Sequence, residues 1–281
     1  MGARHTSRAM RGYPTRNALF FHTLRRLVAS ICCIFLFVQA VRYGRYHFRP
    51  DLSWQRVQAR GVLIVGMDTS YHPFAIMQGE SISGLDVDIA LEVARRLGLR
   101  MQVAPMGVDG LYDALHTGIV DALISALPFD AFRAGTFFYT RPYLDGGYFL
   151  VSPKGAYQRM PDLEGKRLAV EYGSLGDELA RRWLRRLRHL QVQVHAEPSA
   201  ALAAVAEGTA DAALVDYLTA RLWLRDHKSA DLRIAEQPIY SQGYHAVVRS
   251  SDLALASRID AALEAMAADG TLAAILAKWL G

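Results

Sequence analysis

Ala114-Leu-His-Thr-Gly-Ile-Val-Asp-Ala-Leu-Ile-Ser125 recurs ninety residues later as Ala204-Val-Ala-Glu-Gly-Thr-Ala-Asp-Ala-Ala-Leu-Val-Asp216. Each copy has the pattern of a helix end, a glycine suited to a left-handed C-cap, a short turn and a small apolar strand. Each strand then ends in a polar side chain, Ser125 in the first copy and Asp216 in the second. Ligands of open α/β sheets bind outside the carboxyl ends of the strands. The repeat therefore predicts two similar α/β lobes that present polar groups to a shared cleft.

The composition fits a globular protein with two modest cores, because the chain has 281 residues, of which 52% are hydrophobic and 21% charged. The formal net charge is +5, but residues 1–60 hold eleven of the 32 basic residues and only one acidic residue, Asp51. From Gly61 onward 21 basic residues stand against 26 acidic ones. This mildly acidic balance argues against a nucleic acid as the partner.

An apolar run over residues 27–41 lies near the N-terminus, with arginines on both sides. At about 15 residues it is shorter than the roughly 20 that a transmembrane helix needs, and it fits the apolar region of a secretory signal. Val38-Gln-Ala40 offers a cleavage site, but the basic residues that follow disfavour cleavage. We therefore predict an exported protein in which residues 1–50 are either a signal peptide or an N-terminal membrane anchor with a linker.

Both cysteines, Cys32 and Cys33, lie inside this apolar run. Attachment of a lipid would need a small residue before the cysteine, where the chain has Ile31 and Cys32. The rest of the chain has no thiol, so we expect neither a disulfide nor a thiolate site there. The histidines are scattered without ligand spacing, and we predict no metal site and no cofactor.

The pattern after Gly61 predicts alternating strands and helices, which is typical of a parallel sheet covered by helices on both faces. In the first lobe we expect strands at 62–65, 100–104 and 122–125, with helices at 51–60, 84–97 and 109–115. In the second we expect strands within 163–170 and at 192–194 and 211–215, with helices at 178–190 and at 199–207 after an N-capping Ser199.

A last strand at 244–249 needs a sheet partner, which it finds most simply in the first lobe, and helical sequence follows to residue 280 with a break at 269–270. The predicted division is therefore residues 51–151 for the first part of lobe 1, 152–243 for lobe 2 and 244–281 for the return to lobe 1. The chain would cross between the lobes twice.

Several short motifs occur in a specific order and spacing. They are Gly61-Val-Leu-Ile-Val-Gly66, Tyr71-His-Pro-Phe74, Gly84-Leu-Asp-Val-Asp-Ile-Ala90, Asp121-Ala-Leu-Ile-Ser125 with Arg133, Gly173-Ser174, and Gly208-Thr-Ala-Asp-Ala212 with Asp216. From Gly61 to Gly281 the chain resembles the family 3 extracellular solute-binding proteins, the amino-acid receptors of ABC importers. The resemblance implies an α/β, two-lobed, type II periplasmic-binding-protein-like fold with two crossovers at a hinge.

The resemblance also implies a function. It predicts a receptor in the periplasm or on the outer face of the cytoplasmic membrane, a monomer that captures a small amino acid or related carboxylate and delivers it to an ABC transporter permease. Alternatives are a membrane-anchored ligand sensor module and, with less support, a cyclohexadienyl-dehydratase-like enzyme. We expect no enzyme, because the chain has no Ser-His-Asp order, GxSxG elbow, phosphate loop or HExxH motif. A dehydratase would need Glu171 or Asp68 as its general acid.

Arg133 and Asp216 are the two charged residues that the resemblance places on the ligand. A guanidinium offers paired donors to the ligand carboxylate, and Asp216 would accept from the ligand ammonium. One charge from each lobe would let the ligand draw the cleft shut in a hinge motion. A surface arginine and a helix-capping aspartate are the structural alternatives.

The remaining predicted ligand-binding residues come from the same loops. Tyr71 and Phe74 would stack on the ligand or anchor their own loop, and Asp68 would approach the ligand or cap its loop. We expect donors to the carboxylate from Ser125 and the amides of Ala126 and Leu127, and from Gly173, Ser174 and Leu175 at a helix start. Pro128 and Leu175 stand where the family pattern commonly has hydroxyl residues, which predicts a pocket less polar than one for acidic or basic amino acids.

Overall fold

The computed structural model describes residues 30–31, 33–39 and 50–281, and the chain divides into two units, residues 1–50 and 51–281. In the first unit residues 30–31 and 33–39 are helical, with large apolar side chains such as Phe35 and Phe37 exposed. None of the described helices is both long and apolar enough to cross a membrane. Parts of the predicted export segment, including Cys32 and the end of the proposed cleavage site at Ala40, lie outside the described residues.

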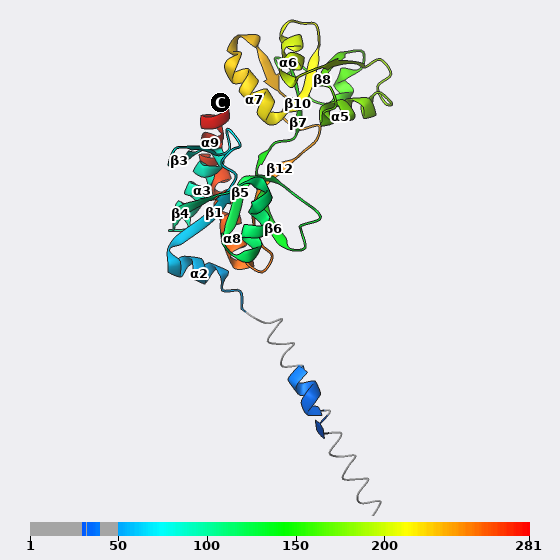
Figure 1. The fold of residues 1–281 in the computed structure, drawn as a ribbon. Coiled ribbons are helices and arrows are strands. Elements are labelled where there is room, and N and C mark those ends of the chain that lie inside the picture. The colour runs from blue at the N-terminus through cyan, green and yellow to red at the C-terminus, as the bar shows by residue number, and fades with distance from the viewer. Residues whose placement is uncertain (1–29, 32, 40–49) are drawn as a thin grey trace, which may run out of the picture. The chain divides into compact units, whose positions relative to one another are not determined.

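The first lobe of the second unit is built on a five-stranded sheet in the order β4-β1-β5-β12-β6 (Figure 1). Its strands are β1 (Val62–Met67), β4 (Arg100–Pro105), β5 (Ala122–Pro128), β6 (Phe137–Asp145) and β12 (Gly243–Arg249). β1 pairs in parallel with β4 and β5, whereas β12 is antiparallel to β5 and β6. The other elements are α2 (Ser53–Arg60), the hairpin β2 (Ile76–Gln78) and β3 (Ser81–Ser83), α3 (Leu85–Arg96), η1 (Val108–Gly110), α4 (Leu111–Thr117), α8 (Leu253–Ala268) and α9 (Thr271–Leu280).

The second lobe is built on a sheet in the order β11-β7-β10-β8-β9. Its strands are β7 (Tyr148–Pro153), β8 (Arg167–Glu171), β9 (Gln191–His195), β10 (Ala212–Asp216) and β11 (Leu232–Ile234). β8 is parallel to β9 and β10, and β7 is antiparallel to β10 and β11. The other elements are η2 (Met160–Leu163), α5 (Leu175–Trp183), α6 (Pro198–Ala206), α7 (Tyr217–Asp226) and η3 (Lys228–Ala230).

The two strands of the sequence repeat occupy equivalent places, each with a buried side chain on both faces of its sheet. In β5, Ile124 packs with α3 and α8 while Leu123 packs with α4. In β10, Leu214 packs with α5 while Ala213 packs with α6 and α7. Because strand side chains alternate, such a strand must be apolar throughout, as both copies are. The predicted helix-covered sheets and left-handed glycines are confirmed, with φ of 81° at Gly118 and 74° at Gly208.

The chain passes between the sheets twice, from β6 to β7 and from β11 to β12. The expected return of the last strand to the first lobe is confirmed, since β12 lies between β5 and β6. The predicted boundary between the lobes at 151/152 differs from the one that strand pairing gives, because β7 pairs with β10 of the second sheet from Tyr148 onward. Residues 148–151 therefore belong to the second sheet.

Two local predictions are wrong, and some elements were not predicted. The helix expected at 178–190 is α5, which begins at Leu175 and ends at Trp183. Arginines four residues apart, at 181/185 and 182/186, oppose further helix because like charges would be adjacent on its surface. Ser199 is not an N-cap, because α6 begins at Pro198, a residue that fits the first turn. The sequence reading also missed β6 and α7.

The start of α3 generates a stability prediction at Gly84. This residue has φ of +152°, and a Cβ atom there would lie 2.1 Å from the carbonyl oxygen of Phe74. We expect Gly84→Ala to lower the free energy of unfolding by about 3 kcal/mol or more, because it adds a backbone clash to an unfavourable φ. Gly79→Ala is the control, since Gly79 has φ of +62° and open space around it. It should cost about 1 kcal/mol in urea unfolding, and equal costs for both variants would contradict the clash.

Candidate functional site

The residues predicted to bind a ligand follow the carboxyl ends of parallel strands in both lobes. Asp68 comes directly after β1, and residues 125–127 lie in the last half of β5. In the second lobe residues 173–175 follow β8, and Asp216 ends β10. This edge of a parallel sheet is where ligands of open α/β folds bind. Apart from Arg133, which lies on the loop after β5, the predicted residues are thus at strand ends or on the loops that leave β1 and β8.

Asp68 and Ser125 join the ends of β1 and β5. The backbone N–H of Asp68 donates to Ser125 Oγ at 2.9 Å. The Asp68 carboxylate accepts from the backbone N–H and the hydroxyl of Ser70 at 3.0 and 2.7 Å. Asp68 therefore caps its own loop, which was the structural alternative. Ser125 Oγ accepts from Asp68 and keeps its own proton, so it can still donate to a ligand.

Tyr71 and Phe74 differ in their exposure. The two rings lie 4.9 Å apart, and Phe74 makes an edge contact with Tyr244 at 5.5 Å. Phe74 is 1% exposed and belongs to the core of the first lobe, whereas Tyr71 is 44% exposed. The prediction that Phe74 stacks on the ligand is therefore wrong, because its ring is covered by protein. Tyr71 remains open to a ligand, with Phe74 behind it.

A buried chain of polar groups that the sequence reading did not find lies behind the end of β5. The Tyr143 hydroxyl donates to Asp86 Oδ1 at 2.8 Å and accepts from the backbone N–H of Ala126 at 3.0 Å. The Ala126 amide is thus engaged by Tyr143, and its predicted role as a ligand donor is not supported by this structure. Leu127 pairs with His245 of β12, and its side chain is 6% exposed in the core beside Phe137.

Asp86 is fully buried, and burial raises its pKa to about 7 despite the hydrogen bond from Tyr143. Its second oxygen has no hydrogen-bond partner among the described residues. In sequence, an acidic residue in the first turn of a helix is ordinary, so nothing there distinguished Asp86 from Asp88, which is partly exposed and pairs with Lys278. Only packing against β5 and β6 makes it exceptional.

Arg133 lies on the loop between β5 and β6 and is partly exposed. Its Nε donates to Asp130 Oδ2 at 3.0 Å, and its guanidinium lies 4.2 Å from the centre of the Tyr112 ring. The Tyr112 hydroxyl is in turn 3.1 Å from that of Tyr139. Neither terminal nitrogen of Arg133 has a hydrogen-bond partner elsewhere in the described part of the chain. The side chain is therefore held in place with its paired donors free.

Asp216 is both a helix cap and a neighbour of the first lobe. Its Oδ1 accepts from the backbone N–H of Thr219 at 2.9 Å, so Asp216 does cap α7, and its second oxygen takes no part in the cap. Burial raises the pKa of Tyr71, and the Asp216 charge raises it further. Burial also raises the pKa of Tyr244, with Tyr71, Asp216 and Asp86 adding to it. The Asp216 carboxylate thus lies near two tyrosines of the opposite lobe.

The start of α5 uses the polar groups that were expected to face a ligand. Ser174 Oγ accepts from the backbone N–H of Asp177 at 3.2 Å and donates to the Glu171 carbonyl at 2.8 Å. The Gly173 amide donates to Asp177 Oδ2 at 3.2 Å. The hydroxyl of Ser174 and the amide of Gly173 are therefore occupied, while Leu175 opens the helix half-buried. The predicted set of donors from this loop is not supported in this conformation.

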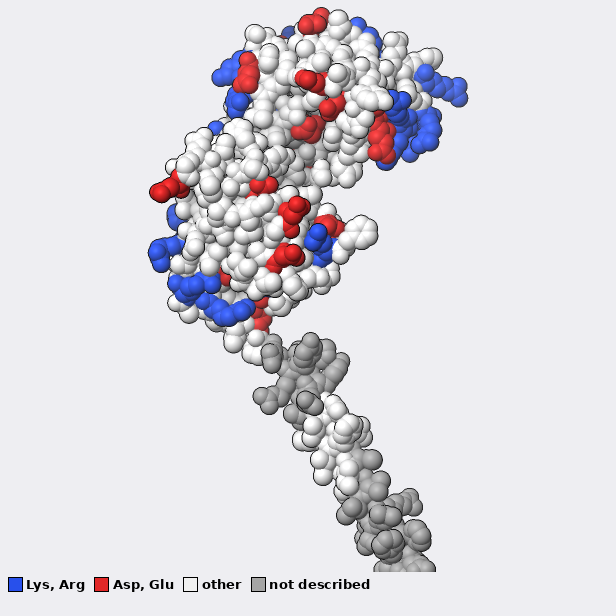
Figure 2. Space-filling model, in the orientation of Figure 1, with Lys and Arg blue, Asp and Glu red and all other residues white. Residues whose placement is uncertain are grey.

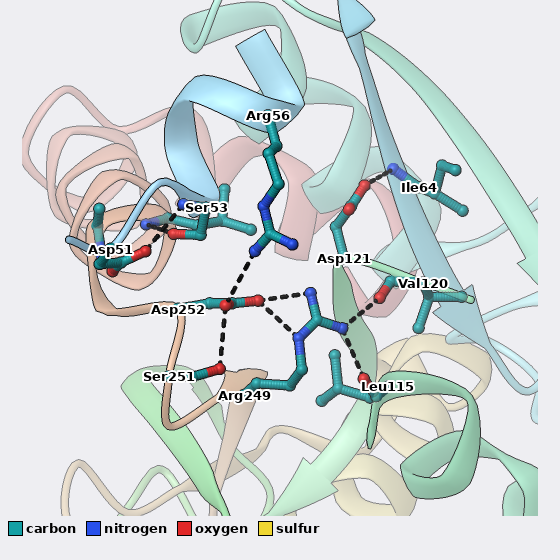
Figure 3. A network of polar contacts seen from close by, with 12 residues as sticks. Asp51, Ser53, Arg56, Ile64, Leu115, Val120, Asp121, Arg249, Ser251 and Asp252 are labelled. Atoms are coloured by element: carbon teal, nitrogen blue, oxygen red, sulfur yellow. Dashed lines mark hydrogen bonds and ion pairs between the residues drawn. The ribbon is translucent and has the colours of Figure 1, made fainter. Parts of the chain in front are cut away.

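A polar hollow of about 260 Å³ lies elsewhere, at the opposite end of the first sheet. Figure 3 shows the network of polar contacts at this end. Arg249 pairs with Asp252 and donates to the carbonyls of Leu115 and Val120 at 2.6 and 2.9 Å. Asp121 accepts from the backbone N–H of Ile64 at 2.8 Å. These bonds tie β1, β5 and β12 to the start of α8, so we interpret the hollow as structural.

A family model described as bacterial extracellular solute-binding proteins, family 3, matches residues 63–281. The L-cystine-binding protein TcyJ of Escherichia coli (strain K12) is 28% identical to this chain over 240 residues, which are 83% of this chain and 88% of TcyJ. The family-model match spans the whole second unit except its first residues.

Two solved structures are similar in fold. The L-cystine solute receptor of Neisseria gonorrhoeae, in its unliganded open conformation, has a TM-score of 0.70 at 22% identity, over 82% of this chain and 97% of that chain. An ancestral cyclohexadienyl dehydratase has a TM-score of 0.71 at 21% identity, over 84% of this chain and 99% of that chain. They confirm the expected two-lobed fold.

The buried Asp86 generates a pH prediction. Its pKa is about 7 in the folded protein against 3.8 for the ordinary group, so the folded protein holds a proton that the unfolded chain releases. The Asp86 contribution to the free energy of unfolding should therefore fall as pH rises from about 4 to about 7, by about 4 kcal/mol in total. Asp86→Asn does not titrate and serves as the reference. Urea unfolding of both proteins across this range would show the difference, and parallel pH profiles would contradict the assignment.

Proposed function

The chain belongs to the bacterial extracellular solute-binding proteins of family 3, and on that premise we propose that it binds a small amino acid or related carboxylate between its lobes and delivers it to an ABC importer. The protein acts as a monomer outside the cytoplasmic membrane, and the transporter permease is its partner. The similarity to the L-cystine-binding protein TcyJ supports an amino acid as the class of ligand.

The proposal rests on two opposite charges, Arg133 on the loop after β5 in one lobe and Asp216 at the end of β10 in the other, which we expect to bind opposite ends of the ligand. A free amino acid is a zwitterion, and neither of its charges can leave water without a partner. Arg133 has free terminal nitrogens for the carboxylate, and Asp216 has one oxygen outside the helix cap for the ammonium. A ligand held at both ends would stabilise the closed arrangement of the lobes.

The rest of the site favours a ligand with an apolar or aromatic side chain. Tyr71 offers an exposed ring face backed by Phe74. Pro128 at the end of β5 and Leu175 at the start of α5 add no hydroxyl. Asp68, which could have paired with a basic side chain, is bonded to Ser70. An acidic or basic side chain would therefore find few partners here.

Binding without catalysis is the second part of the proposal. The fold is shared with an ancestral cyclohexadienyl dehydratase, so the fold does not decide the matter. Asp68 is one of two residues that a dehydratase would need as an acid, and its carboxylate is engaged by two hydrogen bonds from Ser70 within its own loop.

A ligand screen tests the proposal directly. We expect isothermal titration calorimetry of the purified chain to give heat with at least one of the twenty amino acids or with cystine, and the strongest responses with apolar or aromatic side chains. A prephenate-like substrate should not be turned over. No heat and no thermal shift with any compound would count against the receptor, and turnover would favour the enzyme.

Charge removal tests the two ends of the ligand. Arg133→Ala and Asp216→Asn should each weaken binding by about 2 to 5 kcal/mol, because each leaves one ligand charge without a partner. Asparagine keeps the cap on α7, so folding should be preserved in that variant. Arg100→Ala, which removes an exposed arginine that forms no ion pair with a described residue, is the matched control. Unchanged affinity in either site variant would remove that residue from the site.

A further inference from the structure

The end of α5 and the turn after it carry a basic patch of five arginines, Arg181, Arg182, Arg185, Arg186 and Arg188. All five are exposed, and Figure 2 shows Lys and Arg side chains gathered on the side of the second lobe where α5 lies in Figure 1. Residues 51–281 as a whole have 23 basic and 27 acidic side chains. The basic patch is thus a local concentration of positive charge on a folded unit whose net charge is negative.

Only the first two arginines of the basic patch are paired. Arg181 Nε lies 2.7 Å from Asp177 Oδ1, and Arg182 pairs with Glu178. Arg185, Arg186 and Arg188 form no ion pair with any residue in the described part of the chain. The acidic residues that could pair at helical spacing are used up one turn earlier. Three guanidinium groups are therefore free for an external anion.

The basic patch also has apolar parts. A hollow of about 300 Å³ is lined by Leu179, Arg182, Trp183, Arg185 and Arg186, without an acidic side chain. The Arg186 guanidinium lies 5.1 Å from the Trp183 ring centre, and Leu184 is 42% exposed. Guanidinium groups thus surround an indole and a leucine.

We propose that the basic patch docks on an anionic phospholipid surface. Phosphate groups accept paired hydrogen bonds from guanidinium, and tryptophan with leucine fits the boundary between headgroups and acyl chains. Nucleic acids and acidic peptides would use the arginines but leave Leu184 without a partner.

The first unit gives a second reason for a lipid surface. Its described helical residues expose Ile34, Phe35, Leu36 and Phe37. A cluster of basic residues strengthens the attachment of an apolar segment to an anionic membrane. The basic patch supplies such a cluster on the folded unit.

Fluorescence quenching by brominated lipids tests the contact with the full chain. Brominated phosphatidylglycerol vesicles should quench Trp183, whereas brominated phosphatidylcholine vesicles should not. The variant Trp183→Phe distinguishes the emission of Trp183 from that of the other tryptophans, because it should remove the part of the emission that the lipid quenches. The quenching should weaken as sodium chloride rises from about 0.05 to about 0.5 M, because salt screens exposed charges.

The triple variant Arg185→Gln/Arg186→Gln/Arg188→Gln should raise the lipid concentration for half-maximal Trp183 quenching about 100-fold, roughly fivefold for each guanidinium. The control variant Arg100→Gln/Arg233→Gln/Arg258→Gln removes three exposed arginines that form no ion pair with a described residue. It should leave the lipid concentration for half-maximal Trp183 quenching unchanged. Equal quenching by both lipids, unaltered quenching in the first triple variant, or salt-independent quenching would overturn the proposal. So would binding to polyglutamate without quenching, which would indicate an acidic protein as partner.

Discussion

The insertion of β12 between β5 and β6 is the constraint on which this molecule depends. Because the last strand pairs with both neighbours, the chain must return from the second sheet and leave two connections between the lobes. Two connections permit a hinge motion while they limit twisting of one lobe against the other. The same insertion brings Tyr244 into edge contact with Phe74, the ring that lies behind Tyr71.

The polar residues of the candidate site also make structural contacts, and these contacts hold them in place. Ser125 accepts from Asp68 and joins two strand ends, while Asp216 caps α7 with one oxygen. Arg133 rests on Tyr112 and pairs with Asp130. Each is held by other parts of the protein and retains capacity for a further hydrogen bond, and such preorganisation would reduce the entropy lost when a ligand binds.

Two sets of ionisable side chains have different surroundings in the two lobes, one buried in the first and one exposed in the second. In the first lobe, Asp86 is buried with Tyr143 behind the site, where burial raises its pKa. In the second, the arginines of the basic patch lie on the surface, away from the parallel-strand ends. The first arrangement fixes the geometry of β5, and the second leaves charge available to a partner.

Sequence alone determined the two helix-covered sheets, the return of the last strand and the strand-end position of Ser125 and Asp216, because buried strands must be apolar and stop at polar residues. Periodicity could not find β6, because buried and exposed residues follow one another irregularly along this strand. Nor could it show that Phe74 is buried or that the Ala126 and Gly173 amides are engaged, because these depend on neighbours distant in the chain. Only tertiary packing decided which groups are free, since burial and hydrogen-bond partners are properties of the assembled lobes.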